Sequence, residues 1–379
     1  MQKDSDFELF RDNYQRFLAE HVAPFYETWE EQGLIPRELW HKLGDNGFLC
    51  VDVPEEYGGF GAPIHYSQML VQETAKAGFT ALAVGIGGQS ELVSPYIQNI
   101  GSEEQKQYWL PKMVSGEVVT AIAMTEANAG SDLQAIRTQA ILDGDHYVVD
   151  GSKTFISNGH HADLIVLVAK TDPQARAKGI SILLVDAHLD GVKKGRGLKK
   201  IGLHAQDTAE LFFDQVHVPK NQLLGQEGHG FSYLMQELPR ERLSISLMAL
   251  GSIQGAIDIT KEYVLERKAF GQALSQFQNT RFVLAQAQIK ALAAEAFVER
   301  CKDLYSRNAL SVTEVAALKC FITDTQCEVI DQLLQLFGGY GYMQEYPISR
   351  FFVDARVQKI YGGTNEIMKE IVARELLGK

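Results

Sequence analysis

The chain has 379 residues, more than the roughly 250–300 at which a single hydrophobic core stops growing, so two or three packed regions are expected. Acidic side chains number 48 against 36 basic ones, and the net charge of −12 argues against a nucleic-acid-binding protein and against attraction to an anionic membrane. With 45% hydrophobic and 22% charged residues, and no apolar run near the ~18 residues of a membrane span, we expect a soluble protein without a transmembrane segment.

The first ten residues, MQKDSDFELF, lack the basic and apolar regions of a secretory signal and the Arg- and Ser-rich pattern of an organelle presequence. We therefore expect a cytoplasmic location. The four cysteines form no CxxC pair and no cluster with histidine, so neither a disulfide framework nor a zinc site is predicted. The pair His160–His161 has no third ligand nearby in sequence, and we expect no metal site.

Residues 1–121 are predicted to form an N-terminal α-helical domain, because Phe7, Phe10, Tyr14 and Phe17 recur at helical spacing and similar patterns follow. In residues 122–230 the pattern changes to short segments rich in Val, Ile and Phe, separated by turn signals. This region is predicted to be a central β-barrel-like domain. Within it, the run KKGRGLKK at 193–200 is predicted to be a solvated β turn.

Residues 231–379 return to helical periodicity, with Phe282, Ala285 and Ile289 on one face, and are predicted to form a C-terminal four-helix bundle. The fold class is therefore α+β, mainly α. No GxGxxG sequence lies between a predicted strand and helix, which excludes a Rossmann site. Any nucleotide cofactor must be held by another architecture.

Two segments are dense in residues suited to ligand binding. AMTEANAGSDLQA, residues 123–135, combines hydroxyls and small side chains at the junction of the helical and β regions. Residues 335–367 place five glycines and four tyrosines among helical stretches. Glycine-rich turns inside a helical bundle reduce stability, so the close approach of a ligand or a subunit is the favoured reason for them.

These two segments closely resemble the signature regions of the acyl-CoA dehydrogenase family, flavoproteins built from a helical domain, a β domain and a four-helix bundle. ERKAFGQ at 266–272 resembles the family's flavin-pyrophosphate segment, and IVARELL at 371–377 its C-terminal helix. Together, ELPRER at 237–242 and YGGTNEIMKE are most similar to the long-chain branch. The resemblance covers the whole chain and implies the acyl-CoA dehydrogenase fold.

The resemblance also raises the question of the catalytic base. In medium- and short-chain members a glutamate follows the tyrosine of the YxGT run, and here that position is Gly362. In the long-chain and isovaleryl branches the glutamate precedes an arginine on a bundle helix, which implies Glu241, followed by Arg242. Because Pro239 suits the first turn of a helix, we expect Glu241 near a helix N-terminus, whose dipole lowers its pKa, whereas displacement of water by an acyl chain raises it.

For the substrate, the resemblance implies that the Gly362 N–H, with a flavin ribityl hydroxyl, holds the thioester carbonyl and stabilises the enolate. Tyr361, Gly363 and Ser131 would line the same slot. Coenzyme A brings phosphates that need local positive charge, and Arg242 is the best candidate to meet them.

For FAD, the resemblance implies two groups of residues. Those beside the isoalloxazine and phosphates on one subunit are Met124, Thr125, Ser131, Phe155 and Ser157, with Thr364 and Glu366. Those by which a neighbouring subunit holds the pyrophosphate and adenine are Arg267, Gln278, Gln335, Gly338 and Gly339. The family usually has tryptophan and threonine at the positions of Phe155 and Ser157, so stacking and a hydroxyl are retained while the indole N–H is absent.

The resulting expectation is FAD-dependent α,β-dehydrogenation of a medium- or long-chain acyl-CoA to trans-2-enoyl-CoA. Glu241 would remove the α-proton, the β-hydride would pass to flavin N5, and electron-transferring flavoprotein would accept the electrons. A homotetramer, arranged as a dimer of dimers that share FAD across an interface, is also implied.

Three alternatives stay open: an acyl-carrier-protein-linked dehydrogenase, a flavin oxidase or monooxygenase of the same superfamily, and an inactive flavoprotein assembly factor, suggested by Gly362. The chain length of the substrate is not set by the sequence. Small residues at 86–97 suit a deep acyl cavity and tight helix packing equally.

Overall fold

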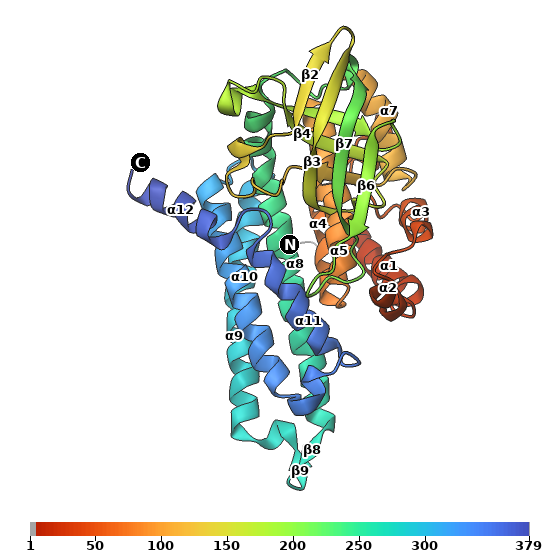
Figure 1. Cartoon of the computed structure of the whole chain (residues 1–379). Coiled ribbons are helices and arrows are strands. Elements are labelled where there is room, and N and C mark those ends of the chain that lie inside the picture. The colour runs from red at the N-terminus through yellow and green to blue at the C-terminus, as the bar shows by residue number, and fades with distance from the viewer. Residues whose placement is uncertain (1–4, 379) are drawn as a thin grey trace.

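The computed structural model describes residues 5–378. Residues 1–4 and residue 379 lie outside the described residues. Residues 1–4 begin the segment MQKDSDFELF, from which we predict that a presequence is absent. Figure 1 shows a curled sheet with the N-terminal helices beside it, and long helices that extend from this region to the opposite end of the molecule. The predicted order of helices, strands and helices is confirmed.

Most of the N-terminal helices pack through one aromatic-rich core that includes the buried Tyr14, Phe17 and Trp40, and the last two helices contribute Tyr96 and Trp109 to a second core that they share with the sheet. A short π-helical turn, η2 (Gly88–Val93), joins two of the helices within the segment of small residues. The helices are α1 (Ser5–His21), α2 (Tyr26–Gln32), α3 (Arg37–Asp45), α4 (Ile64–Lys76), α5 (Thr80–Gly87), α6 (Ser94–Ile100) and α7 (Glu103–Val114).

The central region is a seven-stranded sheet in the order β1-β4-β2-β3-β7-β6, with β5 paired to β4. Strand β4 pairs with β1 in parallel and with β5 antiparallel, and its first six residues are all buried, as expected for a strand covered on both faces. The strands are β1 (Thr120–Ala123), β2 (Gln139–Asp143), β3 (His146–Ser157), β4 (Leu164–Lys170), β5 (Ile180–Asp186), β6 (Val192–Gly197) and β7 (Thr208–Pro219).

The C-terminal region is a helical bundle built around α8 (Gly230–Glu266), which has 37 residues. By length and composition α8 is the one described helix that could cross a membrane, but 78% of its most apolar window is buried inside the protein. It is therefore the core helix of the bundle. The other elements are β8 (Lys268–Ala269), β9 (Gln272–Ala273), α9 (Gln278–Ser306), α10 (Val312–Gln335), α11 (Pro347–Ala355) and α12 (Asn365–Leu376).

The basic run at 193–200 differs from its predicted form. Residues 192–197 form β6, which pairs with β7, and two of the lysines turn inward. Lys194 Nζ donates to His160 O at 2.9 Å and Ala162 O at 2.7 Å, and Lys200 Nζ donates to Gln206 O at 2.6 Å. The expectation of a solvated turn is wrong for Lys194 and Lys200, whose long stems carry their ammonium groups to backbone carbonyls, whereas Lys193, Arg196 and Lys199 are exposed.

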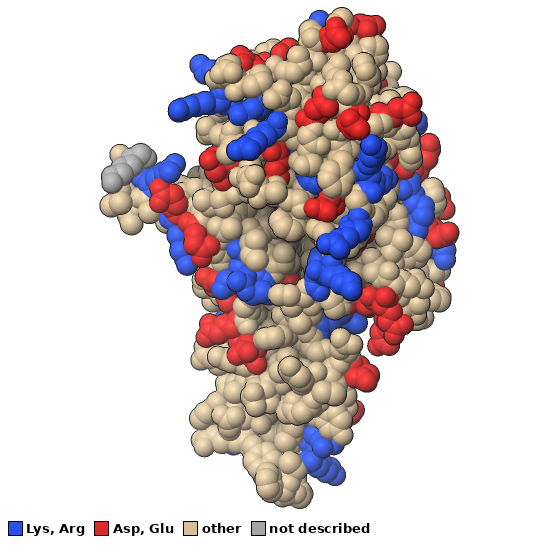
Figure 2. Space-filling model, in the orientation of Figure 1, with Lys and Arg blue, Asp and Glu red and all other residues tan. Residues whose placement is uncertain are grey.

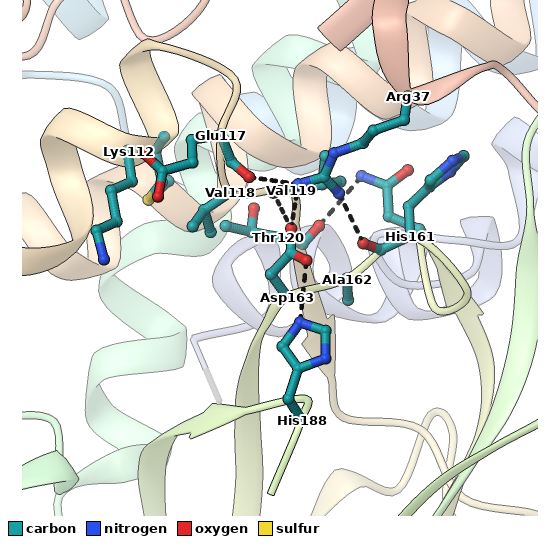
Figure 3. Close-up of polar contacts among 12 residues, drawn as sticks. Arg37, Lys112, Glu117, Val118, Val119, Thr120, His161, Ala162, Asp163 and His188 are labelled. Atoms are coloured by element: carbon teal, nitrogen blue, oxygen red, sulfur yellow. Dashed lines mark hydrogen bonds and ion pairs between the residues drawn. The ribbon is translucent and has the colours of Figure 1, made fainter. Parts of the chain in front are cut away.

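An arginine of α3 fastens the N-terminal helices to the sheet. Arg37 Nη2 lies 2.5 Å from Asp163 Oδ2, and its guanidinium also donates to the carbonyls of His161 and Glu117. Asp163 in turn accepts from Val119 N at 2.8 Å, and His188 approaches it from the other side (Figure 3). One arginine therefore joins segments that are far apart in the sequence.

The loop between β6 and β7 makes a second junction. Leu203 N donates to Asp354 Oδ1 of α11 at 2.5 Å, and Ala205 N donates to Glu30 Oε1 of α2 at 3.0 Å. A single loop of the sheet region thus touches both helical regions. The two junctions hold the three regions in a fixed arrangement around α8.

Replacing Arg37 with methionine should lower the free energy of unfolding by about 1–3 kcal/mol, because Asp163 keeps its partly buried charge and loses its cation. The measurement is chemical denaturation of both proteins in the same buffer. As a control, Lys193→Met removes the exposed pair with Asp214 and should change stability by no more than about 0.5 kcal/mol. Equal effects of the two substitutions would show that Arg37 is not a structural junction.

Candidate active site

Glu241 lies inside α8 and not at the start of a helix. The helix begins at Gly230, so Pro239 occupies an interior position and the expectation of a nearby N-terminal dipole is wrong. Proline removes one hydrogen bond, here to the carbonyl of Met235, whose residue is 40% exposed to water. Burial of the apolar residues on both sides of the proline outweighs that loss.

Glu241 is half-buried with its Oε2 shielded from water, and burial raises its pKa from the ordinary 4.5 to about 7, while the charges of Arg242 and Lys319 oppose the shift. Its Oε2 has no hydrogen-bond partner among residues 5–378. A carboxyl with a pKa near neutrality is suited to take up and release a proton at physiological pH.

The glycine turn faces this carboxyl. Gly362 and Gly363 have φ of 64° and 90°, a conformation that favours glycine. A Cβ placed on Gly362 would lie 3.6 Å from Glu241 Oε1 and 2.3 Å from Ile245 Cδ1. The carboxylate from α8 therefore stands beside the point from which a side chain at position 362 would start. Within the described residues, neither glycine N–H of this turn donates a hydrogen bond.

Two tyrosine hydroxyls accompany the carboxyl. Tyr361 and Tyr96 each bury a hydroxyl without a partner among the described residues, and burial and the charge of Glu241 raise the pKa of both. The hydroxyl of Ser244 is likewise buried and unpartnered. Buried polar atoms without partners are uncommon, and a group of them around one carboxyl is typical of a ligand site.

Arg242 is 4% exposed and points to the turn, where its Nε donates to Gly362 O at 3.3 Å. Burial lowers the pKa of Arg242, while the charge of Glu241 opposes that shift. The structure thus brings Glu241, Arg242, Tyr361, Gly362 and Gly363 together. A contact of Arg242 with coenzyme A phosphates stays a prediction.

The neighbouring Arg240 fixes this part of α8 against the N-terminal helices. Its Nη2 lies 2.8 Å from Asp52 Oδ2, and its Nε lies 3.2 Å from Glu91 Oε2 in the π-helical turn. All three side chains are largely buried. The sequence analysis did not identify this ion network, because its members are separated by up to 188 positions.

The residues predicted to lie beside the flavin ring form one surface where the loop after β1 meets β3. Thr154 N donates to Thr125 O at 2.9 Å, and Lys153 Nζ donates to Met124 O at 2.9 Å. Lys153 is fully buried and also pairs with Glu126 at 2.8 Å, so this loop is held firmly against the strand. Neither charged residue was identified from the sequence.

Phe155 follows on the same strand, at an irregularity between Lys153 and Ile156. It has φ of 59° and its side chain is 68% exposed. Ser157 and Ser131 are exposed as well. An exposed aromatic face with hydroxyls nearby has the chemistry to hold a flat heterocycle with polar edges.

The second predicted cofactor group meets elsewhere, at a pocket of about 540 Å³ near the β8–β9 hairpin. The guanidinium carbon of Arg267 lies 5.1 Å from the Tyr340 ring centroid there. Gln278, at the start of α9, is exposed and is not among the lining residues. Those lining residues are Tyr263, Arg267, Leu274, Gln335, Leu336, Phe337, Gly338, Gly339, Tyr340 and Met343.

Thr364 and Glu366 lie with the glycine turn and not with this pocket. Thr364 is the N-cap of α12, and its hydroxyl accepts from Ile367 N at 3.4 Å. Glu366 is exposed in the first turn of that helix, where hydrogen bonding to a backbone amide lowers its pKa. This exposed acid has the opposite pKa shift to the buried Glu241.

Sequence analysis also missed Lys319 and Asn365, which contact the glycine turn from α10 and α12. One feature of the sequence could have identified Lys319. Lys319 follows Val315 and Leu318, which belong to the buried face of α10, and a lysine beside such a face must find a polar partner.

The raised pKa of Glu241 predicts a pH-dependent effect on stability. The folded-state pKa of about 7 exceeds the ordinary 4.5, so the wild-type protein loses stability as pH rises from 4.5 to about 7. Glu241→Gln avoids this penalty, and its free energy of unfolding should exceed that of the wild type by up to about 3 kcal/mol near pH 8. The gain should vanish near pH 4, as denaturation at both pH values will test. No gain at the higher pH would contradict the buried carboxylate.

Comparison with known proteins follows the same three regions. The family descriptions "Acyl-CoA dehydrogenase, N-terminal domain", "middle domain" and "C-terminal domain" match residues 4–117, 121–216 and 228–377. The mitochondrial long-chain specific acyl-CoA dehydrogenase of Sus scrofa is 44% identical over 375 residues, which cover 98% of this chain and 87% of that protein.

Two solved structures are similar over nearly the whole chain. An acyl-CoA dehydrogenase from Geobacillus kaustophilus is 48% identical with a TM-score of 0.96, covering 98% of each chain. A glutaryl-CoA dehydrogenase from Mycobacterium smegmatis in complex with FADH2 is 26% identical with a TM-score of 0.93, covering 99% of this chain and 95% of that one. The resemblance and the fold predicted from the sequence are confirmed, and the chain belongs to the acyl-CoA dehydrogenase family of oxidoreductases.

Proposed function

We propose that the protein is an FAD-dependent dehydrogenase that converts a medium- or long-chain acyl-CoA to trans-2-enoyl-CoA, with Glu241 as the base. One observation carries the proposal: Glu241 Oε1 lies 3.6 Å from the Cβ position of Gly362, on a turn whose glycine N–H groups donate no hydrogen bond within residues 5–378. A proton acceptor and a hydrogen-bond donor for an oxyanion thus stand side by side.

The chain's own residues divide the chemistry between them. The Gly362 N–H donates to the thioester carbonyl oxygen, which acidifies the α C–H and stabilises the enolate as it forms. Glu241 takes the α-proton onto its carboxylate, and its raised pKa makes it a stronger base than an exposed glutamate. Bound FAD would supply a hydride acceptor for the β hydrogen, so that the two hydrogens would leave as a proton and a hydride.

The cofactor proposal rests on two surfaces of this chain. Met124, Thr125 and Phe155 would hold the ring, because their loop and strand are locked together and Phe155 is 68% exposed. The pocket of about 540 Å³ with Arg267 and Gln335 suits phosphate and adenine, since it combines a guanidinium, an amide and aromatic rings. The FADH2 complex of the glutaryl-CoA dehydrogenase supports the choice of flavin.

The proposal also includes the length of the acyl chain, the electron acceptor and the contact with coenzyme A. The 44% identity to a long-chain specific enzyme favours a long acyl chain. Electron-transferring flavoprotein is the proposed electron acceptor, as the family resemblance implies. Arg242 is the proposed partner of the coenzyme A phosphates in an otherwise acidic protein.

We propose further that the protein is a homotetramer, arranged as a dimer of dimers, in which two copies form each cofactor site. Glu241 and Arg267 are 26 positions apart, with α8 spanning nearly all of that interval, or about 39 Å at 1.5 Å per residue. One chain therefore presents the two halves of the cofactor site at opposite ends, and Figure 1 shows the β8–β9 hairpin far from the sheet.

The surface at the hairpin end supports this arrangement. In Figure 2 the lower part of the bundle is mainly tan, with few charged side chains. Phe270 is 96% exposed, Phe282 63% and Ile289 60%. Exposed apolar side chains gathered on one end are typical of a protein interface.

The central test is Glu241→Gln. The variant should retain FAD, and its rate of flavin reduction by a saturated acyl-CoA should fall at least about 10²–10⁴-fold, because the general base is lost while the shape is kept. Anaerobic loss of flavin absorbance measures this rate over C4 to C20 thioesters and carrier-protein analogues. Glu237→Gln, on the same helix and hydrogen-bonded to Asn99, is the matched control and should reduce at nearly the normal rate.

Other outcomes identify the alternatives. A wild-type flavin that stays oxidised with every substrate would indicate an inactive assembly factor. Reduction followed by rapid reoxidation in air would indicate an oxidase. A Glu241→Gln variant with normal reduction would remove Glu241 as the base.

The shared cofactor site makes a separate prediction. Phe270→Asp should shift the protein to a smaller species in light scattering and should also reduce its FAD content, because one exposed ring would contribute to both. Arg307→Asp introduces the same side chain at another exposed position, directly after the other end of α9, and should alter neither. An unchanged mass together with full FAD occupancy in Phe270→Asp would contradict the shared site.

A further inference from the structure

Lys319 of α10 donates a hydrogen bond to the turn formed by Gly362 and Gly363. It is fully buried on α10, and its Nζ lies 2.8 Å from Gly363 O and 3.1 Å from Asn365 Oδ1. A buried ammonium group is costly unless it is hydrogen-bonded, so these contacts fix both the lysine and the carbonyl that it meets. The position of Lys319 is therefore tied to the turn that carries Gly362.

Asn365 sets the direction of these contacts. Its Nδ2 donates to Thr323 Oγ1 at 3.0 Å and to Asp324 Oδ1 at 3.1 Å, which leaves Oδ1 to face Lys319. Asn365 is also the first residue of α12, next to the N-cap Thr364. Hydrogen bonds thus join Lys319 and the other α10 residues to Asn365 at the start of α12.

The two carbonyls of the turn are held by two different cations. Arg242 Nε donates to Gly362 O at 3.3 Å, and Lys319 Nζ donates to Gly363 O at 2.8 Å. Because a peptide is planar, holding the Gly362 carbonyl fixes the plane that also carries the Gly363 N–H, and holding the Gly363 carbonyl fixes the plane that also carries the Thr364 N–H. The Gly362 N–H belongs to the preceding peptide, so these two contacts act on it by anchoring the backbone that follows it. Glycines have little conformational preference of their own, so these contacts must supply it.

Lys319 also acts on the base through its charge. Its positive charge lowers the pKa of Glu241, against the larger effect of burial. The other groups that affect these two residues are Arg242 on α8, Cys320 and Asp324 on α10, Tyr361 on the turn and Tyr96 on α6. Of these only Arg242 is a second cation, and its charge lowers the pKa of Glu241 more than that of Lys319 does.

We propose that Lys319, oriented by Asn365, is a positioning residue of the reaction: by holding the Gly363 carbonyl it anchors the glycine turn that presents the Gly362 N–H to the thioester oxygen, and it places a positive charge behind that turn. The inference rests on the proposed function. It assigns to Lys319 two separable contributions, a hydrogen bond and a charge.

Two variants separate these contributions. Lys319→Met removes both the donor and the charge, whereas Lys319→Gln removes the charge and keeps a donor for Gly363 O on a side chain one atom shorter. The acid limb of the pH profile of kcat/KM, which reports the free enzyme, should move upward by about 1 unit in both, because a nearby cation is lost. The exposed pair Lys302–Glu299 offers the control Lys302→Met, which should leave the profile unchanged.

The hydrogen bond is tested by binding and not by turnover. Calorimetry on the FAD-loaded proteins compares a trans-2-enoyl-CoA with a thioether analogue that lacks the carbonyl. In Lys319→Met, affinity for the enoyl-CoA should fall about 5-fold more than affinity for the thioether, since only the former uses the Gly362 N–H. Lys319→Gln should restore most of this difference.

The results that would overturn the inference are distinct from those that would overturn the function. If Lys319→Met weakened both ligands equally and kept the wild-type acid limb, Lys319 would be a packing residue only, even with Glu241→Gln inactive. If Glu241→Gln were fully active, the proposed base would be wrong whatever the Lys319 variants did.

Discussion

The site depends on burying one carboxyl, that of Glu241, against a turn made of two glycines. Removing an ionised carboxylate from water costs several kcal/mol unless cations and hydrogen bonds compensate. Arg242 and Lys319 supply the positive charge, and the same two side chains hold the carbonyls of Gly362 and Gly363. The charge balance of the base and the geometry of the turn therefore rest on shared contacts, so neither can change without the other.

This arrangement also explains why position 362 is a glycine. A Cβ there would lie 3.6 Å from Glu241 Oε1 and within 2.3 Å of Ile245 Cδ1, and φ of 64° disfavours any side chain. A glutamate at 362 would place a second carboxylate beside the first, and two such groups do not both ionise. The carboxyl from the helix and a side chain on the turn would thus occupy the same place.

The sequence predicted the order of the three regions and the residues around Glu241, because helical and strand periodicity are local and the resemblance extends over long segments. It did not predict that α8 begins before Pro239, since the packing that outweighs a proline comes from distant segments. For the same reason it placed Lys194 in a solvated turn and overlooked Lys319 and Asn365. Partners that lie in other elements leave no periodic pattern in the residues they contact.

The long helix α8 links the chemistry at one end of the molecule to assembly at the other. Its 37 residues carry Glu241 near the sheet and end directly before Arg267 at the hairpin. The ion network of Arg240 with Asp52 and Glu91 fixes the first part, and the bundle buries the rest. A rigid rod of this length cannot bring its two ends onto one small molecule, and this constraint underlies the proposal that two copies share each cofactor. Under that proposal, loss of assembly would remove the cofactor before it affects Glu241.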